Sequence, residues 1–140
     1  MVEISFRFHR GLLYIPVTIA QKGKELHLGN CIFDTGSAGT TFDVDEVSRI
    51  GITTTTDSKL KRLVTAGGYQ TVFTCEVEKI SLGNITLPKR EVEIGSLHST
   101  FSIQGIIGTD LMQLFDWEIV FSKKKILINT PLRNVVPATS

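Results

Sequence analysis

The chain has 140 residues, enough for one domain with a modest core, and we expect residues 1–140 to form a single domain. A hydrophobic content of 41% and a charged content of 21% are typical of a globular protein and exclude general disorder. The formal net charge of +1 gives no electrostatic reason to expect nucleic acid or a membrane surface as a partner.

The first twenty residues alternate between hydrophobic and polar side chains, as half-buried strands do. The hydrophobic positions are Val2, Ile4, Phe6, Phe8, Leu13, Ile15, Val17 and Ile19. Residues 12–20 could also form a short signal-peptide core, but Pro16 interrupts them and a strand pattern precedes them. No apolar run reaches the roughly 20 residues of a membrane span. We therefore expect a cytoplasmic protein without a membrane partner.

A strand-like segment, Asn30-Cys31-Ile32-Phe33, ends at Asp34, and small or hydroxyl-bearing residues follow it. These residues are Thr35, Gly36, Ser37, Ala38, Gly39, Thr40 and Thr41. Such a turn can hold a carboxylate rigidly at the end of a strand, with backbone donors near its oxygens. Taken alone, the same residues fit an ordinary Asx turn.

Two short helices are predicted among the strands. Asp43 is a candidate N-cap with Glu46 three residues later, and Gly51 is a candidate helix end. A second helix is expected to begin at Thr109 or Asp110.

Short strands separated by turns account for most of the remaining chain. Residues 63–71 resemble two strands joined by the glycine pair Gly67-Gly68, and Glu91-Val92-Glu93-Ile94 alternates between polar and apolar. Lys123-Lys124-Lys125 is expected to form a solvated hairpin turn, and residues 130–140 a tail outside the barrel. Strands of this length and spacing favour an all-β fold with a closed barrel and one or two short helices.

The cysteines and histidines do not indicate a metal site. Cys31 and Cys75 alternate with hydrophobic neighbours, which predicts buried thiols and, by default, a reducing compartment. The histidines His9, His27 and His98 occur singly. We therefore expect no metal and no cofactor.

A second stretch, Ile103 to Met112, complements the turn at Asp34. It places two apolar residues and a glycine, Ile106-Ile107-Gly108, before a short helix, about seventy residues after Asp34. An Asp-Thr-Gly turn, a glycine-rich hairpin and this stretch, in that order, resemble the retropepsin-like aspartic peptidases. The likeness extends from roughly Gly11 to Asn129, and it is strongest to the single-domain cellular and microbial members.

The resemblance implies an aspartic endopeptidase with a retropepsin-like barrel. Its chemistry needs two carboxylates that share a proton, and this chain has one Asp-Thr-Gly, so the second acid would come from another copy in a homodimer. Asp34 is the implied catalytic residue. Thr35 would tie the two turns together, Gly36 would allow close backbone approach, and Ser37 would donate its hydroxyl to the outer oxygen of the carboxylate.

The resemblance also assigns the surroundings of the site, with a polypeptide as substrate. A flap that closes over the substrate is implied for Ala66, Gly67, Gly68 and Tyr69. The floor of the cleft is implied for Ile106, Ile107 and Gly108, with both isoleucines lining the core. Asp110 would start a helix and take no part in the chemistry.

Three alternatives remain open. The turn after Asp34 could be a phosphate-binding loop, although the chain lacks the helices and length of the two-lobed folds that use one. The chain could be a catalytically inactive peptide-binding or dimerisation module with a retropepsin fold. The hairpin at residues 63–71 could be an ordinary surface hairpin.

Overall fold

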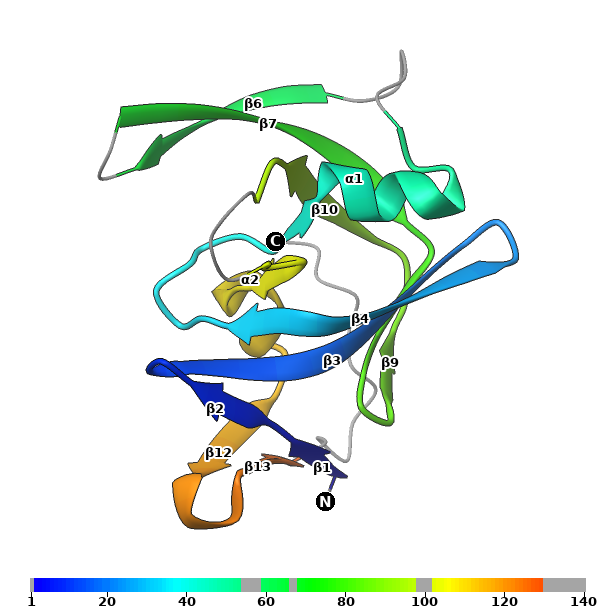
Figure 1. The fold of residues 1–140 in the computed structure, drawn as a ribbon. Helices are drawn as coiled ribbons and strands as arrows, with labels where there is room; N and C mark the ends of the chain where they lie inside the picture. Colours follow the sequence, from blue (N-terminus) through cyan, green and yellow to red (C-terminus); the bar gives the residue numbers. More distant parts are fainter. Residues whose placement is uncertain (1, 54–58, 66–67, 98–101, 130–140) are drawn as a thin grey trace.

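The structure is a computed structural model, and it describes residues 2–53, 59–65, 68–97 and 102–129 (Figure 1). The strands are β1 (Val2–Ser5), β2 (Arg7–His9), β3 (Leu12–Gln21), β4 (Lys24–Phe33), β5 (Thr41–Asp43), β6 (Lys59–Thr65), β7 (Gly68–Val77), β8 (Lys79–Leu82), β9 (Ile85–Leu87), β10 (Arg90–Gly95), β11 (Gly105–Ile107), β12 (Asp116–Val120) and β13 (Lys125–Asn129). The helices are α1 (Val44–Val47) and α2 (Thr109–Met112), with 3-10 turns η1 (Ser48–Ile50) and η2 (Phe121–Lys123). The mainly β content with short helices confirms the expected class.

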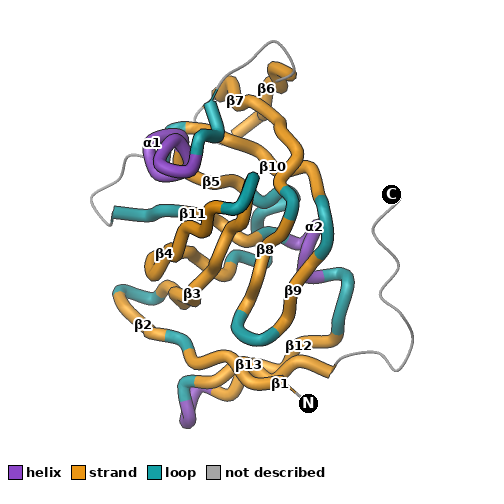
Figure 2. Tube along the Cα trace, turned by 90° about the vertical axis from the view of Figure 1, so that its right-hand side faces the viewer, coloured by secondary structure: helices purple, strands orange, loops and turns teal. Residues whose placement is uncertain are grey.

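The strands form two sheets, whose arrangement is visible in two perpendicular views (Figures 1 and 2). The larger sheet has the order β6-β7-β10-β5-β11-β4-β3-β8-β9, with β2 beside β3, and the smaller has the order β1-β13-β12. Two neighbouring pairs are parallel, β5 with β10 and β4 with β11. Among the described residues no pairing joins β6 to β9, so the larger sheet is an open path where we expected a closed barrel.

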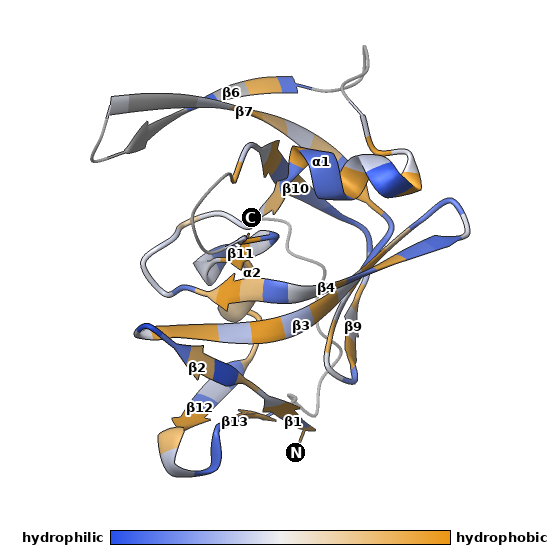
Figure 3. Ribbon diagram, in the orientation of Figure 1, coloured by the Kyte–Doolittle hydropathy of each residue, from blue (hydrophilic) through white to orange (hydrophobic). Residues whose placement is uncertain are grey.

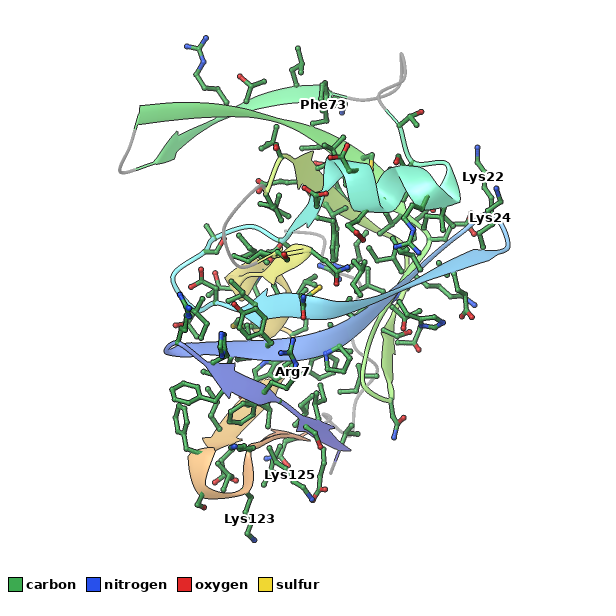
Figure 4. The ribbon with its side chains drawn as sticks, viewed as in Figure 1. Arg7, Lys22, Lys24, Phe73, Lys123 and Lys125 are labelled. Atoms are coloured by element: carbon green, nitrogen blue, oxygen red, sulfur yellow. The ribbon has the colours of Figure 1, made fainter. Side chains whose placement is uncertain are left out.

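The hairpin of β3 and β4 crosses the centre of the molecule and carries much of its core (Figure 3). The predicted alternation in β3 is confirmed, since Ile15, Val17 and Ile19 are all buried. The register between the two strands shifts between Ile15 and Val17, where Pro16 cannot donate a backbone hydrogen bond. The β3–β4 turn, with Lys22 and Lys24, lies at the end of the molecule opposite to the C-terminal end of β4 (Figure 4).

The helix α1 begins and ends as the sequence predicts. The Asp43 carboxylate accepts hydrogen bonds from the backbone N–H groups of Asp45 and Glu46, which caps the N-terminus. Gly51 ends the following turn η1 with φ of 83°, a left-handed conformation that glycine adopts without strain. The helix α2 begins at Thr109, as expected.

One expectation of exposure, at Glu93 of β10, is wrong. The alternation of Glu91 to Ile94 implies exposed glutamates, but Glu93 is buried because Gly39 and Thr41 lie against its carboxylate. Trp117 of β12, at the edge of the smaller sheet, is half-buried and packs against Phe33. The basic turn is confirmed, since Lys124 joins β12 to β13 with φ of 51°. Residues 130–140, the expected tail, lie outside the described residues.

Candidate active site

Asp34 directly follows the last residue of β4 and is held by backbone hydrogen bonds. Its N–H donates to the carbonyl oxygen of Ile107 at 3.0 Å, which ties the start of the turn to β11. Its Oδ1 accepts from the N–H of Gly36 at 2.8 Å. The Ser37 N–H donates to the Asp34 carbonyl at 3.2 Å and closes the turn. The carboxylate is half-buried, so one side remains open to a substrate or a partner.

The three residues after Asp34 have different environments. Gly36 lies so near the carboxylate that a Cβ atom added there would be 3.1 Å from Asp34 Oδ1. Thr35 is exposed. Ser37 departs from its predicted contact, because its hydroxyl donates to the carbonyl oxygen of Gly39 at 2.8 Å instead of to Asp34. The serine therefore stabilises the turn itself within one chain.

The turn crosses the start of α2 at Gly108. A Cβ atom added at Gly108 would lie 2.5 Å from the Gly39 carbonyl oxygen and 2.6 Å from that of Ser37. The next residue, Thr109, donates its N–H to the Ser37 carbonyl at 2.8 Å. Only a residue without a side chain permits this crossing, so Gly108 fixes the distance between the turn and α2.

The two isoleucines before Gly108 point in different directions. β11 pairs in parallel with β4, so that Ile106 lies beside Ile32 and Ile107 beside Phe33. Ile107 is fully buried, whereas Ile106 is only half-buried on the other face of the strand. The prediction that both line the core is therefore wrong for Ile106, because neighbouring residues of a strand alternate between faces.

Asp110 makes contacts that the sequence analysis missed. Its Oδ1 accepts from the Thr40 hydroxyl at 2.7 Å and from the Leu111 N–H at 2.9 Å, and its Oδ2 accepts from the Thr40 N–H at 3.1 Å. The Thr40 hydroxyl in turn accepts from the Gly108 N–H at 3.1 Å. Asp110 is thus both a helix-starting residue and a clamp on the far end of the Asp34 turn.

The comparisons with known proteins agree with this geometry. A family model described as "Aspartyl protease" matches residues 15–111, a span that includes both the Asp34 turn and Gly108. The chain belongs to the aspartyl protease family. The solved structure of a retropepsin-like aspartic protease from Rickettsia conorii is similar to this chain with a TM-score of 0.64, over 92% of this chain and 89% of that chain. At 17% identity this likeness shows a retropepsin-like fold. No curated protein sequence matches the chain significantly.

A further carboxylate, that of Glu93, contacts the Asp34 turn from the sheet side. Glu93 of β10 is 7% exposed, and its Oε1 accepts from the Thr41 hydroxyl at 2.9 Å. A Cβ atom added at Gly39 would lie 2.8 Å from both carboxylate oxygens of Glu93. A cavity of about 540 Å³ opens beside Gly39 and Glu93, and Asp34 does not line it.

The contact of Glu93 predicts a graded response to substitution. Glu93→Ala should lower the free energy of unfolding by about 1–3 kcal/mol, because it leaves the buried Thr41 hydroxyl without this acceptor. Glu93→Gln keeps an oxygen at that position and should cost less. Denaturant unfolding of the two variants measures the difference. Equal losses for alanine and glutamine would show that the acceptor oxygen kept by glutamine does not stabilise the Thr41 hydroxyl.

The segment predicted as the flap lies in the β6–β7 hairpin. β6 and β7 pair from Lys59 with Thr74 to Thr65 with Gly68, and Gly68 has φ of 120°. The hairpin extends from the body of the molecule on the side to which β4 points when it ends (Figure 1). Ala66 and Gly67 lie outside the described residues, and the Tyr69 backbone belongs to β7.

Both cysteines of the chain, Cys31 and Cys75, are free thiols. Cys31 is buried as predicted, and Cys75 is half-buried. Burial raises the pKa of the Cys31 thiol, with a smaller contribution from Glu46, so this thiol stays protonated.

The described residues contain no group of three or more His, Cys, Asp or Glu side chains that could hold a metal ion. No helix in the described part of the chain has the length and apolarity to cross a membrane.

Proposed function

We propose that the protein is an aspartic endopeptidase that cleaves peptide bonds with a water molecule activated between two Asp34 carboxylates. Each carboxylate would come from one subunit of a homodimer. The observation that carries the proposal is the single Asp-Thr-Gly turn, with Asp34 held by Gly36 and Ile107 at the end of β4. A catalytic dyad needs two such turns, and the chain has only one.

The chemistry follows from two carboxylates that face each other and share one proton. Like charges about 3 Å apart are not both ionised, so one acid is protonated and the other is not. The ionised carboxylate accepts a proton from water as the water attacks the peptide carbonyl carbon. The protonated acid donates its proton to the carbonyl oxygen. The carboxyl group that took a proton from water then passes it to the leaving nitrogen as the C–N bond breaks, and one hydroxyl of the intermediate returns a proton to the other carboxylate.

The residues around Asp34 serve this arrangement in different ways. Thr35 is exposed beside the carboxylate, and in the proposed dimer its hydroxyl reaches the partner's turn. Gly36 supplies the N–H that holds Oδ1, and the crossing at Gly108 keeps the turn against α2.

The β6–β7 hairpin is proposed as the flap, with Ala66, Gly67, Gly68 and Tyr69 over the bound polypeptide. A flap excludes water from the reaction and adds backbone hydrogen bonds to an extended substrate. Both cysteines are free, which suits the cytoplasm as the proposed location, and residues 1–140 are proposed to act as one domain without a cofactor.

Mixing of intact and inactive subunits tests the shared site. Wild-type protein and the Asp34→Asn variant are combined at a constant total concentration and allowed to exchange subunits. If both acids are required, activity should fall as the square of the wild-type fraction, because only dimers of two intact chains are active.

The control is the same mixture with exchange prevented, for which activity should fall linearly. A linear fall after full exchange, or full specific activity in a verified monomer, would show that one chain makes its own site.

A further inference from the structure

Two cavities adjoin each other along β7 and β10. The first, of about 540 Å³, lies beside the Asp34 turn and is lined by residues of that turn, of both strands and of α2. The second, of about 450 Å³, lies towards the β3–β4 turn, where Lys22 is labelled in Figure 4. Thr74, Glu76 and Glu91 line both cavities, so the cavities meet at these residues. We define the two cavities together as the β7–β10 groove.

The strand register explains why these side chains gather on one face of the sheet. Thr74 of β7 lies opposite Glu93 of β10, and Glu76 lies opposite Glu91. Opposed residues of an antiparallel pair share a face, and so do residues two positions apart along a strand. The Glu93 carboxylate lies against Gly39, so this face looks towards the turn. The groove therefore begins at the turn and reaches the second pair of glutamates about 7 Å further along the strands.

Glu76 and Glu91 form a like-charge pair across the two strands. Equal charges at directly opposed positions of an antiparallel pair repel each other. The Glu76 carboxylate lies 3.6 Å from the Lys89 ammonium group, but both side chains are largely exposed and water weakens the ion pair. No described residue forms a hydrogen bond or an ion pair with the Glu91 carboxylate. The repulsion between the two glutamates is therefore only partly relieved within the chain.

Thr74 adds a buried hydroxyl to the groove. The residue is 7% exposed, and within the part of the chain that the structure describes its hydroxyl has no hydrogen-bond partner. Buried polar groups are normally hydrogen-bonded, because an unpaired one loses its contacts with water without replacement. An unpaired hydroxyl in the lining of two cavities indicates a ligand that supplies the missing partner.

The charges around the first cavity favour a cationic ligand. The charged residues that line it are Glu76, Glu91, Glu93, Asp110, Lys89 and Arg90. Four carboxylates thus stand against two cations, and the Nη1 atom of Arg90 is buried. The second cavity adds Lys22 and Lys59, at the end remote from the turn. The acidic part of the groove is therefore the part next to the turn.

We propose that the β7–β10 groove binds a lysine or arginine side chain of the polypeptide substrate, several residues away from the peptide bond that is cleaved. The proposal rests on the peptidase function proposed above, and it names the class of substrate. The cationic group lies between Glu76 and Glu91 and donates a hydrogen bond to the Thr74 hydroxyl oxygen. An extended polypeptide advances about 3.3 Å per residue, so the groove receives a side chain beyond those that flank the cleaved bond.

Peptide binding to the Asp34→Asn variant tests the groove without cleavage. A fluorescent peptide of uncharged residues is compared with a series in which one residue at a time is lysine. Norleucine at the same position is the reference, because it has a similar length without the charge. Lysine at a preferred position should bind about 10-fold more tightly than norleucine, as expected for a charge-assisted hydrogen bond. Added salt should reduce the difference.

Substitutions in the groove identify the groups responsible. In the same Asp34→Asn background, the double substitution Glu76→Gln and Glu91→Gln should lower the ratio of lysine to norleucine affinities to about 1. Glu118→Gln is the matched control, because Glu118 is an exposed glutamate of β12 and the ratio should be retained. Thr74→Val should lower the ratio in part without loss of thermal stability, since an unpaired hydroxyl contributes no hydrogen bond to the fold.

The outcomes separate the groove from the peptidase activity. Equal affinity for lysine and norleucine at every position, or no peptide binding at all, would overturn the proposal. An unchanged lysine preference in the folded double variant would also overturn it, and circular dichroism establishes the folding. Cleavage of the same peptides by the wild type tests the peptidase function by itself. A lysine preference in binding without cleavage would support the groove and reject only the peptidase function.

Discussion

Replacement of Asp34 by asparagine is expected to reduce peptide cleavage by about 10³-fold or more, because an amide neither accepts the proton of the attacking water nor shares a proton with a second acid. The fold should be retained, since the amide oxygen can still accept the hydrogen bond that Gly36 donates to Asp34 Oδ1. Turnover of a peptide substrate by the purified variant measures the loss, and thermal unfolding establishes that the variant is folded.

Asp45→Asn is the matched control for this experiment. This substitution makes the same chemical change at an exposed residue of α1, away from the turn, so activity should remain close to that of the wild type.

The activity of the wild type should also follow a bell-shaped pH profile, whose two apparent pKa values belong to the pair of acids together. Unchanged turnover in Asp34→Asn, or a flat profile from about pH 3 to pH 9, would contradict a shared-proton dyad.

Gly108→Ala is expected to lower the free energy of unfolding by about 1–3 kcal/mol or more. The added Cβ atom would overlap the carbonyl oxygens of Gly39 and Ser37, at 2.5 and 2.6 Å. Both atoms belong to the backbone, so no rotation of a side chain relieves the overlap. The backbone at Gly108 is extended, with φ of −104°, so the cost comes from the close crossing and not from the dihedral angle.

Gly29→Ala is the control for this second experiment. No atom lies within 4 Å of a Cβ atom added at Gly29, so its stability should change by less than about 0.5 kcal/mol. Denaturant unfolding compares the two variants, and peptide cleavage should fall in Gly108→Ala because the Asp34 turn moves with the crossing. Equal stability of both variants would mean that the turn and α2 can separate freely.

The parts of the structure that were predictable from the sequence depend on neighbours along the chain. Asp43 caps α1 and Gly51 ends the following turn because cap and turn geometry involve residues a few positions apart. The alternation of β3 is likewise local, and it identifies the buried residues Ile15, Val17 and Ile19 correctly. The Asp-Thr-Gly turn and the glycine at position 108 were recognisable because their residue types are unusual in combination.

The parts that were missed depend on contacts between distant segments. Asp110 clamps Thr40 across 70 residues, and Glu93 binds Thr41 across 52 residues, so no local pattern identifies either pair. Alternation placed Glu93 in solvent because it does not reveal that Gly39 of the Asp34 turn packs against the carboxylate of Glu93. The predicted contact of Ser37 with Asp34 was wrong because the Ser37 hydroxyl donates to the Gly39 carbonyl oxygen instead.

β11 lies between β4 and β5, and this position determines how early the Asp34 turn can form. The Asp34 N–H needs the Ile107 carbonyl, and the far end of the turn needs Asp110, so the turn has no native partners until those residues have been synthesised. Contacts this distant close late in folding, because the intervening chain must first lose its freedom. A nascent chain that ends before β11 therefore carries the Asp-Thr-Gly sequence without its geometry. The Asp34 carboxylate therefore acquires its native position only after β11 and α2 have been synthesised.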